Sequence, residues 1–408
     1  MRNREQNEFP TIEAGIAAAR GFQAAGVHCG IKKAKKDLAV IFSERPATVA
    51  AVFTTNRTLA EPLVVDKLQL KRSRFCSLVV INSGNANACT GRQGLRDAWT
   101  TIKEVAKVVN IPEKHVLVSS TGVIGKKLPM TKMKAGIHSA AKHLSPQGHA
   151  EAAQAILTTD TYTKEYAVNF RLGTKTVTVG GMAKGSGMIA PNMATMLAFV
   201  STDAVISSFL LQKALTTAVN KSFNRITVDG DTSTNDMVLL FANGLAGNPP
   251  MKEGATAFGR FSAALEQVLA ALAKMIARDG EGATKLVEVV VNGARQEKDA
   301  IQAARAIANS NLVKTAIHGA DANWGRILAA VGYSGIDFEP EKVEISFDHV
   351  PILKRNFRAN FSEARARAAL SNENVNITVD LNLGRKSATF WTCDFSKEYV
   401  SINANYRS

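Results

Sequence analysis

The chain has 408 residues, enough for two domain-sized units, and its 46% hydrophobic and 21% charged residues are typical of soluble globular proteins. Residues 1–8 are polar and no apolar run could span a membrane, so we expect no signal peptide and a cytoplasmic protein. The four cysteines form no Cys-x-x-Cys pair and have no histidines at metal-binding spacing, which argues against a disulfide framework and structural zinc.

The net charge of +15 is concentrated in the first half of the chain. Residues 1–194 contain 27 Lys and Arg against 13 Asp and Glu, whereas residues 195–408 contain 23 against 22. The basic clusters are short, lack interleaved aromatic residues and accompany no nucleic-acid-binding motif, so we interpret them as solvated surface. Attraction of anionic substrates is the next interpretation. A basic nucleic-acid-binding protein remains the alternative from another functional class.

Strand-like and helix-like runs alternate along the chain, which predicts an α/β protein. Residues 15–26 are rich in small side chains and predict a loop or a short helix. Apolar patterns then predict the following elements in the first half: strands at 39–42, 49–53, 75–81 and 116–118, helices at 94–109, 133–143 and 150–157, and a hairpin at 170–180 around Gly173.

Two polar segments of the first half have simple local interpretations. Residues 119–125, Ser-Ser-Thr-Gly-Val-Ile-Gly, follow a strand and are typical of a capped turn in which hydroxyl groups satisfy free amides. Residues 158–161, Thr-Thr-Asp-Thr, follow a helix and are typical of local hydrogen bonds between side chain and backbone.

The stretch at residues 181–200 is the most informative one. A glycine-rich run, Gly-Met-Ala-Lys-Gly-Ser-Gly-Met, leads to a turn at Pro191-Asn192 and then to a short apolar run at 196–200 that predicts a buried strand. Thr195 therefore lies at a junction of loop and strand, where its hydroxyl can be held rigidly and remain accessible. Most threonines at such junctions are caps or surface residues.

The second half continues the alternation, with helices predicted after Ser207 and at 255–277, 302–309 and 362–370, and strands at 286–291, 343–347, 376–381 and 388–393. Residues 229–236, Asp-Gly-Asp-Thr-Ser-Thr-Asn-Asp, look like a calcium loop, but Thr234 replaces the required glycine and Leu240 the bidentate glutamate. We expect a polar turn between strands and assign no metal. Glu281 lies between glycines, as turn residues do, and residues 399–408 are expected to be a frayed end.

The residues that precede and include Thr195, Lys-Gly-Ser-Gly-Met and Ala-Pro-Asn-Met-Ala-Thr-Met-Leu, resemble the self-cleavage site of the ornithine acetyltransferase (glutamate N-acetyltransferase, ArgJ-type) family. The resemblance extends from Gly21-Phe22 to Asn403 and implies a cut between Ala194 and Thr195. Fragment 1–194 would carry an oxyanion loop and the basic surface. Fragment 195–408 would begin with the nucleophile and end in a substrate-binding tail. A layered α/β/β/α fold of the DmpA/ArgJ type, with the two fragments still associated, is implied as well.

The resemblance also implies roles for single residues. Thr195 is the expected nucleophile, and the hydroxyl of Thr121 and the backbone N–H of Gly122 are the expected oxyanion hole. The expected substrate contacts, besides Thr195 itself, are Thr158, Glu281, Asn403 and Ser408. From charge rather than from the resemblance, we add Lys184 as a partner for a substrate carboxylate and assign Glu281 to an ammonium group.

The implied activity is transfer of the acetyl group from N2-acetylornithine to glutamate in arginine biosynthesis, by ping-pong kinetics through an acetyl-Thr195 intermediate. The resemblance implies no metal and no bound cofactor, an assembly of two copies of each fragment, and neither a nucleic-acid nor a membrane partner. It leaves open whether acetyl-CoA is a second acetyl donor. The nearest alternative is a related N-terminal-threonine aminopeptidase, which would release the acyl group to water.

Overall fold

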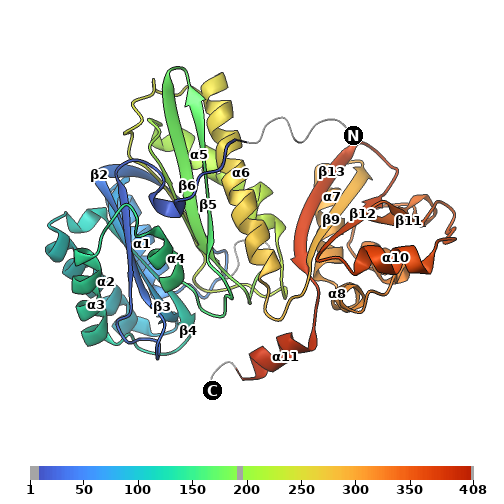
Figure 1. Ribbon diagram of the computed structural model, residues 1–408, viewed down its shortest axis with the longest axis horizontal. Helices are drawn as coiled ribbons and strands as arrows, with labels where there is room; N and C mark the ends of the chain where they lie inside the picture. The colour runs from blue at the N-terminus through green and yellow to red at the C-terminus, as the bar shows by residue number, and fades with distance from the viewer. Residues whose placement is uncertain (1–8, 191–195, 406–408) are drawn as a thin grey trace. The chain divides into compact units, whose positions relative to one another are not determined.

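The computed structural model describes residues 9–190 and 196–405, and these form two compact units. Unit 1 comprises Met1–Gly185, Asn192–Asn224 and Thr232–Leu272, and unit 2 comprises Ser186–Pro191, Arg225–Asp231 and Ala273–Ser408. Each unit contains one β-sheet together with helices, so the expected α/β class is confirmed (Figure 1).

Unit 1 contains an eight-stranded sheet with the order β4-β3-β2-β8-β7-β6-β5, and β1 pairs with β2 outside this path. The strands are β1 (Phe22–Val27), β2 (Leu38–Phe53), β3 (Phe75–Asn85), β4 (Val116–Val123), β5 (Lys164–Leu172), β6 (Lys175–Lys184), β7 (Leu197–Thr202) and β8 (Met237–Ala242). The expected hairpin around Gly173 is confirmed as β5 and β6. The two strands expected at 39–42 and 49–53 are instead one long strand, β2.

The length of β2 lets the sheet fold over on itself. Its first part pairs with β3, its register shifts between Phe42 and Ala47, and its last part pairs with β8. The two halves of the sheet consequently face each other across one apolar cluster. Ile41 and Ile81 contribute to this cluster from one half, and Phe199 and Leu239 contribute from the other.

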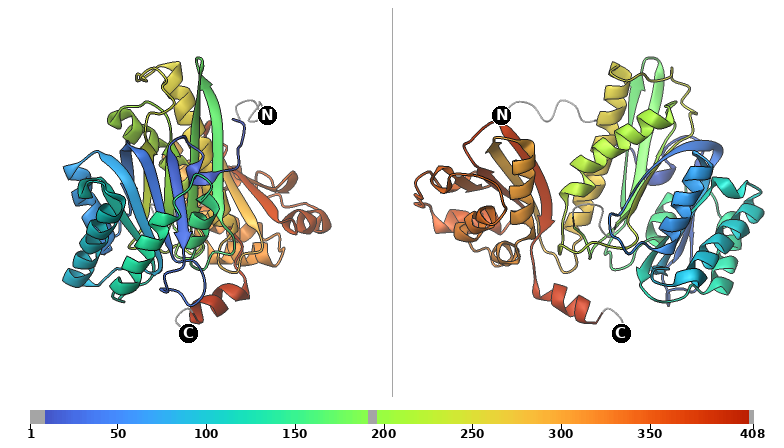
Figure 2. Two further views of the ribbon diagram at one scale, coloured as in Figure 1. Left: turned by 60° about the vertical axis from the view of Figure 1, so that its left-hand side comes forward. Right: turned by 180° about the vertical axis from the view of Figure 1, so that it is seen from behind.

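Helices cover the outer faces of both halves. Val40 and Val80, on the other face of β2 and β3, pack against helices α2 (Gly91–Val109) and α3 (Met130–Lys142). On the opposite outer face, α5 (Ser208–Lys221) packs against β2 and β8, and Leu272 of α6 (Thr256–Arg278) lies against Gly181 of β6. The order helix, strand, strand, helix confirms the layered α/β/β/α arrangement within unit 1 (Figure 2).

Two further helices complete unit 1, α1 (Glu61–Arg72) and α4 (His149–Ala155), together with the 3-10 turns Gly15–Ala17 and Glu113–His115. The 3-10 turn Phe223–Arg225 follows α5. Helix α5 begins at the expected cap, because the Ser207 side chain accepts a hydrogen bond from the Leu210 N–H.

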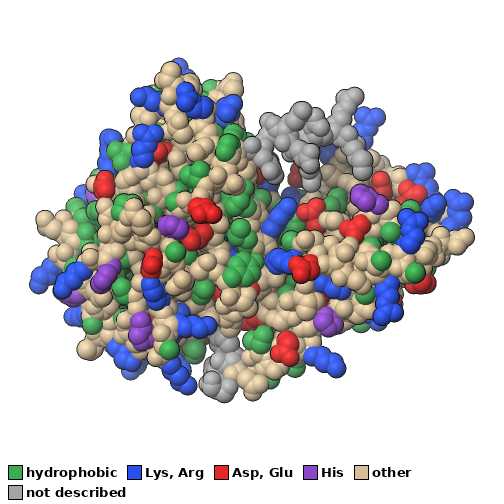
Figure 3. Space-filling model, in the orientation of Figure 1, with side chains coloured by type: hydrophobic (Ala, Val, Ile, Leu, Met, Phe, Trp, Pro, Cys, Tyr) green, Lys and Arg blue, Asp and Glu red, His purple; other side chains and the backbone are tan. Residues whose placement is uncertain are grey.

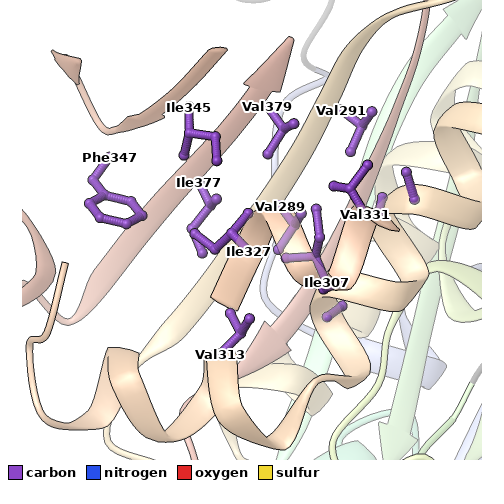
Figure 4. Packing of buried hydrophobic residues seen from close by; sticks show 14 of the residues in the cluster. Val289, Val291, Ile307, Val313, Ile327, Val331, Ile345, Phe347, Ile377 and Val379 are labelled. Atoms are coloured by element: carbon purple, nitrogen blue, oxygen red, sulfur yellow. The ribbon is translucent and has the colours of Figure 1, made fainter. Parts of the chain in front are cut away.

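Unit 2 contains a five-stranded sheet with the order β11-β10-β12-β9-β13. Alternate residues of β9 and β12, among them Val289 and Ile377, point into one apolar cluster, against which Ile307, Val313 and Ile327 pack from three helices (Figure 4). The elements are β9 (Leu286–Ala294), α7 (Glu297–Asn309), α8 (Asn311–His318), α9 (Trp324–Gly332), the 3-10 turn Pro340–Lys342, β10 (Glu344–Phe347), β11 (Val350–Leu353), α10 (Glu363–Leu370), β12 (Asn374–Asp380), β13 (Lys386–Cys393) and α11 (Lys397–Ala404). Helix α11 lies where we expected a frayed end.

The two units do not coincide with the two fragments that the sequence predicts. Strands β7 and β8 follow residue 195 but belong to the sheet of unit 1, where β7 pairs with β6 over six residues and β8 pairs with β2. A cut before Thr195 would therefore separate two chains that share one hydrogen-bonded sheet.

Lys and Arg side chains are dispersed among acidic and apolar ones on the face drawn in Figure 3. Among the helices within residues 9–190 and 196–405, none combines the length and the apolarity needed to cross a lipid bilayer.

Candidate active site

The first group of predicted residues lies at the end of β4. Thr121 is buried, and Gly122 has a φ of +132°. A Cβ atom on residue 122 would lie 2.4 Å from the carbonyl carbon of Gly84 on the parallel strand β3. Both the backbone angle and the close approach of the strands therefore require glycine at position 122.

Lys184, the last residue of β6, brings its ammonium group to the same place. Its Nζ donates a hydrogen bond to Thr158 Oγ1 at 2.7 Å and lies 3.5 Å from Thr121 Oγ1. The structure thus brings together four of the predicted residues, Thr121, Gly122, Thr158 and Lys184, in unit 1. A substrate carboxylate near Lys184 would find a cation and hydroxyl groups within a few ångströms.

Asp160 lies beside this lysine and pairs with its ammonium group. Its carboxylate lies 3.8 Å from Lys184 Nζ and 2.8 Å from Lys164 Nζ, and it accepts backbone hydrogen bonds from Gly185 and Thr158. Burial opposes ionisation of Asp160, but the two neighbouring ammonium groups outweigh it and hold the pKa of this carboxyl well below its usual range. Lys164 is fully buried, so Asp160 balances two buried cations.

Lys32 adds a further amine at this end of the sheet. Its Nζ donates to the carbonyl oxygen of Leu157 at 2.6 Å, next to Thr158. Burial lowers the pKa of Lys32 to about 8, an effect that the charge of Asp37 partly offsets and that of Lys184 reinforces.

The turn before β8 connects the end of β4 to the start of β7. The Asn235 side chain donates to the carbonyl oxygens of Ser120 at 2.8 Å and Ala86 at 2.7 Å. The next residue, Asp236, accepts the Met196 N–H through Oδ1 at 2.9 Å. Residues 120 and 196 are therefore held by two adjacent side chains, although they are far apart in sequence.

The structure describes residues on both sides of the proposed cleavage site but not the site itself. Ala194 and Thr195 lie outside the described residues, between Lys184 of β6 and Leu197 of β7, which are paired partners in the antiparallel register. Met196, the residue that follows the predicted nucleophile in sequence, precedes Leu197 and lies at the same end of the sheet as Lys184.

The second group of predicted residues lies in unit 2. Glu281 Oε2 accepts a hydrogen bond from Asn403 Nδ2 at 2.8 Å, and the Glu281 N–H donates to the Ser186 carbonyl oxygen. A Cβ atom on Gly187 would lie 2.3 Å from the Glu281 carboxylate, so the glycine makes room for it. Two predicted substrate residues, Glu281 and Asn403, are thereby in direct contact, whereas Ser408 lies outside the described residues.

The loop at residues 186–190 is also held by the acidic turn that looks like a calcium loop. Asp229 accepts the N–H groups of Met188 at 2.6 Å and Ile189 at 2.8 Å, and the Tyr399 hydroxyl donates to it at 3.2 Å. Burial and the neighbouring charge of Asp229 raise the pKa of the Tyr399 hydroxyl well above its usual range. Within the described ranges, no three His, Cys, Asp or Glu side chains are grouped closely enough to hold a metal ion.

Sequence reasoning missed three contributors, Asp160, Asn235 and Asp236. Their segments, 158–161 and 229–236, attracted attention as polar turns, and local hydrogen bonding explained both of them adequately. Only the folded sheet shows that the first holds Lys184 and that the second holds Met196.

The chain is similar to known proteins over nearly its whole length. Residues 23–408 match the model of the ArgJ family. The chain is 51% identical over 401 residues to the arginine biosynthesis bifunctional protein ArgJ of Caldanaerobacter subterraneus subsp. tengcongensis, a match that covers 97% of this chain and 99% of the relative. It is 48% identical over 397 residues to the protein of the same name from Listeria monocytogenes serotype 4b, with 97% and 99% covered.

A crystal structure of the arginine biosynthesis bifunctional protein ArgJ from Bacillus halodurans is 49% identical in sequence, with a TM-score of 0.50. The match covers 51% of this chain and 98% of that one. The extent and identity of these matches, over nearly the full length of the chain, show that the protein belongs to the ArgJ family.

Proposed function

We propose that the chain cleaves itself between Ala194 and Thr195 and then transfers the acetyl group of N2-acetylornithine to glutamate, as a glutamate N-acetyltransferase of arginine biosynthesis. The observation that carries this proposal is the family match over residues 23–408. The convergence of Thr121, Gly122 and Lys184 at the start of β7 supports it.

Cleavage comes first because a threonine hydroxyl needs a base within hydrogen-bonding reach. The nitrogen of Thr195 is an amide in the precursor and cannot accept a proton. Attack of Thr195 Oγ on the Ala194 carbonyl breaks the C–N bond and gives an ester together with a free α-amine, whose reference pKa is about 8. Hydrolysis of the ester then releases the Ala194 carboxyl group and the Thr195 hydroxyl. The Bacillus halodurans chain, 98% of which is matched by about half of this one, supports such a division.

The same hydroxyl then carries the acetyl group. Thr195 Oγ attacks the acetyl carbonyl of N2-acetylornithine and passes its proton to the α-amine, the C–N bond breaks, and ornithine leaves with that proton. The amine of glutamate attacks the acetyl ester in the second half-reaction, which regenerates Thr195. Thr121 and Gly122 stabilise the oxyanion of each tetrahedral intermediate, for which a single donor contributes roughly 10²–10³ in rate.

Substrate recognition follows from charge. Lys184, which lies 3.8 Å from the Asp160 carboxylate, pairs with the substrate carboxylate, and Thr158 supplies a hydroxyl beside it. Glu281 pairs with a substrate ammonium group, with Asn403 holding its carboxylate, and Ser408 contacts substrate from the tail. The chemistry needs no metal and no bound cofactor.

We also propose that two copies of each fragment assemble and that the enzyme works in the cytoplasm without a nucleic-acid or membrane partner. The shared sheet, in which β7 pairs with β6 and β8, supports lasting association of the fragments. Sedimentation of the purified protein should give the mass of two copies of fragment 1–194 and two copies of fragment 195–408. Cell fractionation should place the protein in the soluble fraction.

The first test is a denaturing gel of the purified protein. It should show two bands, of 194 and 214 residues, and Thr195→Ala should give one uncleaved and inactive band of 408 residues. Cleavage in Thr195→Ala, or full activity in an uncleaved wild-type chain, would remove Thr195 from its role.

The second test measures acetyl transfer to glutamate with each donor separately. Transfer from N2-acetylornithine establishes the proposed activity, and transfer from acetyl-CoA would make the enzyme bifunctional, as the names of its relatives state for them. Release of the acyl group to water, with no acetylglutamate formed, would favour the N-terminal-threonine aminopeptidase instead.

A further inference from the structure

The ammonium group of Lys32 has a hydrogen-bond donor to spare. Its Nζ donates to the carbonyl oxygens of Lys36 at 2.8 Å and Leu157 at 2.6 Å. No carboxylate among residues 9–190 and 196–405 lies within ion-pair distance of this nitrogen. Since an ammonium group has three N–H donors, the third is available to a ligand. The side chain is half-buried, so a ligand bound there would be partly shielded from water.

Lys32 lies against the first group of candidate site residues. A Cβ atom on Gly84 would lie 3.0 Å from Lys32 Cγ, and Gly84 is the partner of Gly122 in the parallel register of β3 and β4. One carbonyl oxygen that accepts from Lys32 Nζ belongs to the residue just before Thr158, whose hydroxyl accepts from Lys184 Nζ. Lys32 therefore contacts both the strand beside Gly122 and the segment that binds Lys184.

A buried carboxylate fixes the turn that carries Lys32. Asp37 is fully buried and accepts the backbone N–H groups of Cys29 at 2.6 Å, Gly30 at 3.1 Å and Lys32 at 2.9 Å, with His28 Nδ1 3.4 Å away. Burial opposes ionisation of Asp37, but these N–H groups outweigh it and lower the pKa of the carboxyl. The backbone position of Lys32 is thus set before any ligand binds.

Positive charge exceeds negative charge at this end of the sheet. Three ammonium groups, those of Lys32, Lys164 and Lys184, act there together with two carboxylates, those of Asp37 and Asp160. A bound anion would reduce the repulsion among the cations.

The acceptor of the proposed reaction carries two carboxylates. Glutamate attacks with a neutral amine, and in that form it has an α-carboxylate, a side-chain carboxylate and no cation. Lys184 is already assigned to the carboxylate that both substrates share. The side chain of N2-acetylornithine instead ends in an ammonium group, which the charge of Lys32 would repel. A second cation at the site would consequently favour the side chain of the acceptor.

We propose that Lys32 is a specificity-determining residue of the acceptor site, and that its Nζ donates the third N–H to the side-chain carboxylate of glutamate. This inference rests on the proposed function, in which glutamate is the acetyl acceptor. Lys184 binds the α-carboxylate, and Lys32 then selects an acidic side chain. Glutamine, which replaces the side-chain carboxylate by an amide of nearly the same shape, lacks the charge that Lys32 recognises.

The test compares glutamate with glutamine as acceptors, with N2-acetylornithine as the donor. Lys32→Met keeps an unbranched stem over Gly84 but removes the charge. It should lower the ratio of kcat/KM for glutamate to kcat/KM for glutamine roughly 10- to 100-fold, because one partner of a partly shielded ion pair is lost. The KM for N2-acetylornithine should stay unchanged. Lys32→Arg, which keeps a cation, should retain the preference for glutamate.

Lys132→Met is the matched control. Lys132 lies on α3, and its Nζ donates to the Gly30 carbonyl oxygen at 2.7 Å, in the same turn as Lys32, but its side chain is exposed. The ratio should not change in this variant. An unchanged ratio in Lys32→Met, or an equal fall in Lys132→Met, would overturn the proposal. Failure of the proposed function is distinguishable, because the wild type would then transfer no acetyl group to either acceptor.

The pH dependence of the wild type provides a second measurement, which applies even if Lys32→Met fails to fold. Burial lowers the pKa of Lys32 to about 8, reinforced by the charges of Lys184 and Lys35 and opposed by those of Asp37 and Asp160. The ammonium form is lost above that pH, so the ratio of kcat/KM values should fall as the pH rises above about 8. Titration of Lys184 and of the acceptor amine affects both acceptors and cancels in the ratio.

Lys32→Arg sharpens this measurement, because a guanidinium group stays charged throughout the same pH range. Its ratio of kcat/KM values for glutamate and glutamine should be independent of pH. A wild-type ratio that stays constant between about pH 7 and 9 would overturn the proposal.

Discussion

The charged residues around Lys184 in unit 1 and the apolar cluster in unit 2 are both buried, yet different forces hold each group together. In unit 2, alternate residues such as Val289 and Ile377 fill a space between one sheet and three helices, so volume is what matters. At the end of β6 in unit 1, the charged side chains of Asp160, Lys164 and Lys184 are buried. Their stability depends on pairing the two ammonium groups with the carboxylate. The comparison teaches that burial alone does not say which substitutions a position tolerates.

The largest effect is expected from Asp160→Asn, which breaks the charge balance. It leaves Lys164 and Lys184 buried without their carboxylate, which typically costs about 3–5 kcal/mol. Thermal unfolding at one fixed protein concentration should show a large fall in Tm at neutral pH.

Ile377→Val in unit 2 is the matched core substitution. It removes one methylene group from a fully buried side chain and should cost only about 0.5–1.5 kcal/mol. Equal losses of stability in the two variants would show that the charges of unit 1 are no more critical than ordinary packing.

Gly122→Ala should come next, because position 122 is set by backbone approach rather than by charge. The new Cβ would collide with Gly84 and displace the N–H that we propose as an oxyanion donor, so kcat for acetyl transfer should fall roughly 10²–10³-fold. Gly125→Ala is the control: its φ is +81°, but no atom lies within 4 Å of the new Cβ. A similar loss of kcat in both variants would point to backbone strain alone.

The pH dependence of stability should separate two kinds of buried carboxyl group. The folded-state pKa of Asp160 is lowered, so its stabilisation is present at neutral pH and is lost as the pH falls below about 4. The difference in Tm between wild type and Asp160→Asn should therefore shrink towards acid pH.

Asp66 should behave in the opposite way. Burial raises its folded-state pKa well above the unfolded value, so the wild type loses stability as the pH rises above about 4. Asp66→Asn, which stays neutral, should gain stability relative to wild type between pH 4 and 8. Parallel Tm profiles for the wild type and both variants would contradict these assignments.

The smallest effect is expected from Asn403→Ala in unit 2. Loss of its 2.8 Å hydrogen bond to Glu281 should raise the KM for substrate about 2- to 10-fold, the equivalent of about 0.5–1.5 kcal/mol, with kcat little changed. Asn405→Ala, on the same end of the chain, removes a hydrogen bond to the Ser401 carbonyl oxygen and should leave KM unchanged. Equal values of KM in the two variants would leave Asn403 without a role in binding.

Much of the fold was predictable because its apolar patterns are regular. The helix predicted at 255–277 lies one residue from its predicted position, and the predicted hairpin turns at Gly173 as expected, with strands that extend further at both ends. The pattern fails where polar residues are buried. Helix α1 was not predicted, because Glu61, Asp66 and Gln69 point inward and find backbone partners that only the folded chain provides.

Strand β2 shows the second reason for failure. Its polar centre at residues 43–46 suggested a break, but the strand continues through a register shift and joins the two halves of the sheet. The candidate site likewise contains residues that the sequence identified and residues that it did not. The resemblance identified Thr121 and Gly122, and charge identified Lys184, whereas the contact of Asp160 with Lys184 depends on the end of β6 meeting the turn after α4, which no local pattern encodes.

The pairing of β7 with both β6 and β8 has a consequence for how the mature enzyme would fail. A precursor folds as one molecule, but severed halves that melt apart must find each other again by diffusion. Cleavage would thus turn refolding into a second-order reaction. Heat inactivation should become slower at higher enzyme concentration and harder to reverse on dilution. The dependence of the inactivation rate on enzyme concentration would therefore report the proposed self-cleavage independently of a gel.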